Sequence, residues 1–120
     1  MSFTLERFAR EQDSAAVMGS GAVHVFGTPA MILLMEEAAA ACVQGELPEG
    51  SATVGTMVNI RHLSATPIGA KVSAKARLVG IDGRFLEFVV EAHDENGLIG
   101  DGTHQRAVID VARFMSKFDK

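Results

Sequence analysis

Three residues in this chain are of types that can act together on an acyl group, namely Thr28, Glu36 and His62. In acyl transfer one group attacks the carbonyl or positions water, one moves protons, and one holds the carbonyl or the imidazole. Each residue also has an ordinary structural explanation. Thr28 could cap a helix, Glu36 could lie on the surface, and His62 could be a buried histidine whose nitrogens are satisfied. The residue types therefore predict an acyl-transfer site only if the fold brings them together.

Two of these residues belong to a predicted helix that runs from Thr28 to Gly45. Thr28 suits the N-cap, Pro29 suits the first helical position because no N–H is needed there, and Gly45 provides a stop. The residues between them are apolar on almost every side, so we expect other structure to wrap the helix. A carboxylate at Glu36 is costly to bury in such a helix unless it is paired or used.

The spacing limits what the helix can do alone. Eight residues separate Thr28 from Glu36, which corresponds to a rise of about 12 Å and a rotation of roughly 80°. The two side chains lie broadly on one side of the helix but cannot touch. His62 or the substrate must therefore lie between them.

The chain before the helix has a weaker pattern. Residues 3–13 are ambiguous between an edge strand and an irregular lead-in, and residues 16–18 and 22–26 resemble short strands on either side of a turn at 19–21. After the helix, residues 46–50 have the Pro and Gly of a loop, and the period of the pattern then changes to about 2. This change predicts a sheet that follows the helix.

Four successive strands are predicted in this second part of the chain. In the first, from Val54, the even-numbered positions form the apolar face, which places His62 with the core residues. The others cover residues 70–78, 86–92 and 98–111, with hairpin turns at 82–83 and 96–97. The whole pattern predicts an α+β fold of the hot-dog type, in which a curled antiparallel β-sheet is wrapped around one long central α-helix.

The composition predicts a single domain over residues 1–120, with 48% hydrophobic and 22% charged residues. The net charge of -4 argues against nucleic acid as a partner, because binding to a phosphate backbone needs a surplus of Lys and Arg. Cys42, the one cysteine, is expected to be a small core residue without a disulfide. Scattered histidines, among them His24 and His104 as structural or rim residues, give no metal-ligand spacing, so we expect no metal and no cofactor.

No signal peptide or membrane segment is predicted. The first residues carry an early acidic side chain and no long apolar run, and the most apolar stretch, Ala30 to Val43, is too short to cross a bilayer. We therefore expect a cytoplasmic protein with no membrane partner.

Several ungapped segments at consistent spacing resemble the fluoroacetyl-CoA thioesterase-like branch of the hot-dog thioesterases, and the likeness covers nearly the whole chain. The segments are Gly19–Gly21, Val25–Met31, Leu34–Glu36, Thr53–Thr56, Arg61–Leu63, Ala65–Gly69, Ile99–Gly102 and His104–Arg106. The resemblance implies hydrolysis of a small acyl-CoA thioester by a homodimer, or a higher homo-oligomer, with active sites at or near the subunit interface.

The resemblance also implies roles for individual residues. The family's catalytic threonine, glutamate and histidine fall on Thr28, Glu36 and His62. Its glycine whose N–H contacts the thioester carbonyl falls on Gly55, where a residue without a side chain lets the backbone approach an oxyanion. The glutamate either attacks the thioester or helps to activate water, and the sequence does not distinguish these routes.

Recognition of coenzyme A is expected at Arg106, because a guanidinium group binds phosphate well. Lys71 and Lys75 are outside possibilities, since a solvated strand face explains both. Nothing in residues 15–26 identifies the apolar lid of the fluorine-selective member, so the prediction is a general thioesterase for short-chain or aromatic acyl-CoA. Two alternatives stay open, an acyl-CoA-binding or regulatory module without turnover, and an enoyl-CoA hydratase, for which residues 29–44 lack an Asp/His pair.

Overall fold

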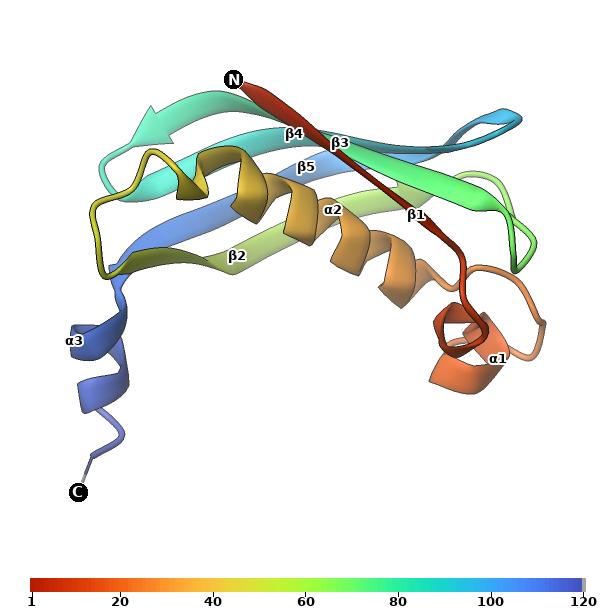
Figure 1. Cartoon of the computed structure of the whole chain (residues 1–120), viewed down its shortest axis with the longest axis horizontal. Helices are drawn as coiled ribbons and strands as arrows, with labels where there is room; N and C mark the ends of the chain where they lie inside the picture. Colours follow the sequence, from red (N-terminus) through yellow and green to blue (C-terminus); the bar gives the residue numbers. More distant parts are fainter. Residues whose placement is uncertain (120) are drawn as a thin grey trace.

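One long helix lies against a single curled antiparallel sheet in the computed structural model, which describes residues 1–119 (Figure 1). The elements in chain order are β1 (Ser2–Phe8), η1 (Glu11–Asp13), α1 (Ala15–Met18), α2 (Thr28–Gln44), β2 (Ser51–His62), β3 (Lys71–Asp82), β4 (Phe85–Asp94), β5 (Gly97–Asp110) and α3 (Val111–Ser116). No helix within residues 1–119 has the length and apolar character needed to cross a membrane.

The five strands are ordered β1-β3-β4-β5-β2, and every neighbouring pair is antiparallel. All four strands predicted after the helix are present. The first of them, β2, does not pair with β3, the next strand in the chain. The chain crosses the sheet between these two strands, and β2 pairs with β5 at one edge. Asp82 pairs with Phe85 and Asp94 with Gly97, so both hairpin turns lie one residue away from the predicted pairs.

The core lies between α2 and the inner face of the sheet. Val72, Ala74 and Ala76 of β3 and Phe88 and Val90 of β4 are at most 1% exposed. The helix contributes Met31, Leu34, Met35, Ala38 and Ala39 to the same cluster. Small side chains on both α2 and β3 allow the helix to lie close to the strand, and the alternation predicted for β3 and β4 is confirmed.

The helix begins differently from the prediction at its N-terminus. Gly27 is the N-cap, with an extended backbone, and Thr28 is the first helical residue. The predicted N-cap role of Thr28 is therefore wrong, and its hydroxyl contacts His62 instead. The sequence also predicted that other structure would wrap the helix. In a single chain this covering is incomplete, because Leu33 of α2 is 48% exposed.

The segment before α2 contains no strand at residues 16–18. Ser14 accepts a hydrogen bond from the Val17 backbone N–H at 3.0 Å, and Gly19 ends the turn with φ 84, so Ala15–Met18 forms the short helix α1. The strand prediction was wrong because a side-chain cap and a left-handed glycine outweigh the β preference of one valine. Residues 22–26 form only isolated bridges, through Val25 and Phe26.

A bulge in β2 changes which side chains face the helix. Gly55 pairs with Arg106 and Met57 with Gln105, so Thr56 is the extra residue. The odd-numbered Thr53 and Gly55 lie on the helix side before the bulge, and the even-numbered His62 lies there after it. The predicted even-numbered face is correct only beyond the bulge, because one extra residue reverses the alternation of a strand.

Candidate active site

Thr28 and His62, the first two candidate residues, meet where α2 starts and β2 ends. The Thr28 hydroxyl Oγ1 lies 2.7 Å from His62 Nδ1. The other ring nitrogen, His62 Nε2, is buried and has no hydrogen-bond partner within residues 1–119. Burial lowers the pKa of His62 and outweighs the opposite influence of the Ser64 backbone, so the neutral imidazole is favoured. A pocket of about 330 Å³ lies beside the pair.

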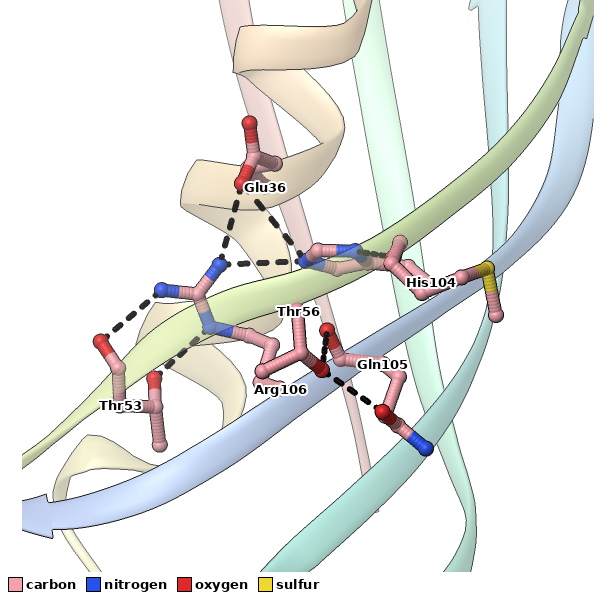
Figure 2. Close-up of polar contacts among 7 residues, drawn as sticks. Glu36, Thr53, Thr56, His104, Gln105 and Arg106 are labelled. Carbon is pink, nitrogen blue, oxygen red and sulfur yellow. Dashed lines mark hydrogen bonds and ion pairs between the residues drawn. The ribbon is translucent and has the colours of Figure 1, made fainter.

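Glu36, the third candidate residue, lies further along α2 and has a different set of neighbours. Figure 2 shows its carboxylate directed toward two side chains of β5, with Oε2 at 3.4 Å from Arg106 Nη1 and 3.9 Å from His104 Nε2. Arg106 also donates from Nε to Thr53 Oγ1 at 2.8 Å and from Nη2 to the Thr53 carbonyl at 3.0 Å. Arg106 is 7% exposed, so its guanidinium is a fixed donor beneath the carboxylate.

The hydrogen bonds of His104 define its charge and tautomer. Its Nδ1 lies 2.7 Å from the Met57 carbonyl, which can only accept, and its Nε2 lies 3.1 Å from Arg106 Nη1, which can only donate. His104 therefore carries its proton on Nδ1 and is neutral, and its contact with Glu36 is not an ion pair. Burial, the main influence on the pKa of His104, lowers it and favours the same neutral form.

Gly55 leaves room for the carboxylate of Glu36. A Cβ atom at this position would lie 2.6 Å from Glu36 Oε2, closer than real side chains approach. A pocket of about 280 Å³ opens here, lined by Glu36, Gly55, His104 and residues 56–58. The Glu36 side chain is 35% exposed, so an acyl group in this pocket could reach it.

The whole chain is similar to known thioesterases. The sequence profile of the fluoroacetyl-CoA-specific thioesterase family matches residues 9–112. The chain belongs to this family. The fluoroacetyl-CoA thioesterase of Streptantibioticus cattleyicolor is 41% identical over 93 residues, which cover 78% of this chain and 67% of that protein.

Solved structures agree with the family assignment. A mutant of the fluoroacetyl-CoA-specific thioesterase in complex with fluoroacetate and coenzyme A is 33% identical, with a TM-score of 0.90 over 95% of this chain and 96% of that one. A thioesterase superfamily member from Thermus thermophilus is 28% identical, with a TM-score of 0.90 over 98% of this chain and 88% of that one. The predicted family, hot-dog fold and class of reaction, thioester hydrolysis, are confirmed.

Within one chain, the fold separates the residues that the family resemblance groups together. Thr28 contacts His62, and Glu36 lies over Gly55, but no hydrogen bond or ion pair joins Glu36 to His62 within residues 1–119. Gly55 and His62 are seven residues apart on β2, a separation of about 20 Å in a strand. The expected approach of Glu36 to His62 therefore does not occur within a single chain.

Arg106 is buried, whereas the sequence analysis predicted a phosphate contact at this residue. Its guanidinium is buried and already donates to Thr53, His104 and Glu36, whereas the predicted phosphate contact needs an accessible group. Lys71 is half exposed and lies 3.5 Å from Glu6. His104 was interpreted as structural or rim, although its separation of two residues from Arg106 on a strand could have indicated a shared face. Within residues 1–119, no group of three or more side chains could hold a metal ion.

Proposed function

We propose that this protein hydrolyses a small acyl-CoA thioester to a carboxylic acid and coenzyme A. The observation that carries this proposal is the carboxylate of Glu36. One of its oxygens is near Arg106, and it lies beside a pocket kept open by Gly55. The similarity to the Streptantibioticus cattleyicolor thioesterase supports the substrate class. We place the protein in the cytoplasm as part of the same proposal, because acyl-CoA thioesters are made and used inside cells.

Glu36 is the reacting group in this proposal. Arg106 contacts Oε2, so Oε1 can either attack the thioester carbonyl, expelling the coenzyme A thiolate, or accept a proton from an attacking water. In the first route water then cleaves the resulting anhydride and regenerates the carboxylate. The backbone N–H of Gly55 stabilises the oxyanion, since no side chain blocks its approach.

Thr28 and His62 complete the site from a second copy of the chain. β2 is an edge strand whose Met57 and Val58 are 38% and 47% exposed, and an unpaired edge can pair with the same edge of another copy. Antiparallel β2–β2 pairing centred between Val58 and Asn59 would place His62 opposite the partner's Gly55. His62 Nε2 is buried and unpaired in one chain, and in this arrangement it would lie near the carboxylate of the partner's Glu36.

The test is a thiol-release assay over a panel of short-chain and aromatic acyl-CoA substrates, comparing the parent protein with Glu36→Ala and His62→Ala. Each substitution is expected to lower kcat by about 100-fold or more, the scale of losing a group that moves protons. Unchanged rates in both variants would contradict the site assignment. If the parent releases no coenzyme A from any thioester, the protein is a binding module instead.

Mixing the two inactive variants tests the shared site. In a mixed dimer, the Glu36 of one chain meets the His62 of the other, so one of the two sites is intact. Random reassociation should restore about a quarter of the parent activity. A site built within one chain predicts no restoration, because every chain would lack one of the two groups. Size measurements on both variants check that they still form dimers.

A further inference from the structure

A basic pocket lies at the end of the sheet, away from Thr28 and His62. Its volume is about 380 Å³, and it is formed where the turn between β3 and β4 meets the end of β5 and α3. Three cationic side chains line it, Arg84, Arg113 and Lys117. All three residues are exposed, which makes this pocket accessible to a ligand in solution.

These three cations form no ion pair with an acidic side chain of residues 1–119, and the same holds for Lys75 and Arg77 on β3. Among residues 1–119, an ion pair is formed by Arg7, Arg10, Arg61, Lys71 and Arg106, but not by Arg84, Arg113 or Lys117. Asp110 is the one carboxylate that lines the pocket, and it accepts a hydrogen bond from the Arg113 backbone N–H at 2.9 Å. The lining therefore carries a formal charge of +2, three cations and one carboxylate, in a chain whose net charge is -4.

Aromatic rings help to hold two of the cations. Lys117 Nζ lies 3.9 Å from the centre of the Phe114 ring, and Arg84 Cζ lies 5.0 Å from the centre of the Phe85 ring. Such cation–π contacts favour a defined side-chain position. Phe114 also lines the pocket and is half-buried, so its ring lies beside the charges. Several cations next to an aromatic ring suit a phosphorylated purine nucleotide.

β5 connects this pocket to the site around Glu36. Arg106 contacts Glu36, Val108 pairs with Thr53, and Asp110 lines the pocket. Arg106, Val108 and Asp110 are alternate residues of β5 and share one face of it. Four residues of strand span about 13 Å, a distance that the extended pantetheine arm of coenzyme A can cover.

We propose that this pocket binds the 3′-phosphorylated adenosine diphosphate end of coenzyme A. The proposal rests on the proposed function for its substrate, and it replaces the phosphate contact expected at Arg106, whose guanidinium is buried. Arg84, Arg113 and Lys117 contact the phosphates, while the pantetheine arm extends from the pocket toward Glu36. Arg113, Phe114 and Lys117 lie beyond residue 112, where the match to the family profile ends.

The test compares an acyl-CoA with the same acyl group on pantetheine, which lacks the nucleotide. In the triple variant Arg84→Gln, Arg113→Gln, Lys117→Gln, we expect the KM for acyl-CoA to rise by about tenfold or more. The kcat for acyl-CoA and both constants for acyl-pantetheine should stay within about twofold. The control is Arg77→Gln, which removes an exposed cation of β3 outside the pocket and should leave all constants unchanged.

Calorimetry keeps the test independent of turnover. The parent protein should bind coenzyme A and 3′,5′-adenosine diphosphate, with inorganic phosphate binding at least tenfold more weakly, and the triple variant should lose this binding. If the parent protein shows no turnover, the binding loss still supports the pocket while the proposed function fails. Equal KM changes for both substrates, no change for either, or a preference for inorganic phosphate would overturn the assignment.

Discussion

Replacing Gly55 with alanine should damage the chemistry without damaging the fold. The new Cβ would lie 2.6 Å from Glu36 Oε2, and 3.4 Å and 3.5 Å from His104 Cε1 and Arg106 Nη1. Carbon and oxygen atoms in ordinary contact are separated by more than 3 Å, so the carboxylate must move by at least about half an ångström. This movement changes its contact with Arg106, which is already 3.4 Å long.

The expected effect on kcat follows from this displacement. A misplacement of about 1 Å in a reacting group can cost about 100-fold in rate, so we expect kcat in Gly55→Ala to fall by roughly 30-fold to 100-fold. Stability should change little, because the atom that must move ends a flexible side chain, and alanine in a strand loses less backbone entropy than glycine. We expect Tm to stay the same or rise slightly.

Thiol-release kinetics and thermal unfolding measure the two effects separately. Gly80→Ala is the matched control, because a Cβ at this position in β3 meets only Glu87 side-chain carbons at 3.5 Å and 3.8 Å. The control should keep both the parent kcat and the parent Tm. A Gly55→Ala variant with the parent kcat would refute the idea that Glu36 must occupy this position, and a large loss of Tm would show that Gly55 has a structural role instead.

Two further predictions concern the groups around Glu36. Arg106→Gln should lower kcat by about tenfold or more and the free energy of unfolding by about 3 kcal/mol, since Glu36 and His104 lose a buried donor. Steady-state kinetics measure the first effect and urea unfolding the second. If both values stay at the parent level, Arg106 does not position Glu36. Burial lowers the pKa of both His62 and His104 below 6.5, so the unfolded chain binds more protons than the folded chain just below that pH. The free energy of unfolding should therefore fall as pH drops from about 7.5 to about 5.5. This fall should be smaller in His104→Gln.

The fold was predictable from local patterns because each element carries its own periodicity. Alternating residues in β3 and β4 identified the buried face of the sheet, and the apolar run from Ala30 to Val43 identified the central helix. Short segments were predicted less well. A serine cap and a glycine stop formed α1 where a strand was expected, since a few local hydrogen bonds decide the structure of so short a segment.

Only the tertiary structure determined which chemical groups meet. The sequence identified Glu36, His62 and Arg106 by residue type, but the bulge in β2 and the pairing of β2 with β5 decided their neighbours. One extra residue turned Gly55 toward Glu36, and burial of Arg106 beneath the carboxylate removed it as a phosphate ligand. Periodicity can indicate which residues are buried, whereas the contacts of a buried charge depend on strands far apart in the chain.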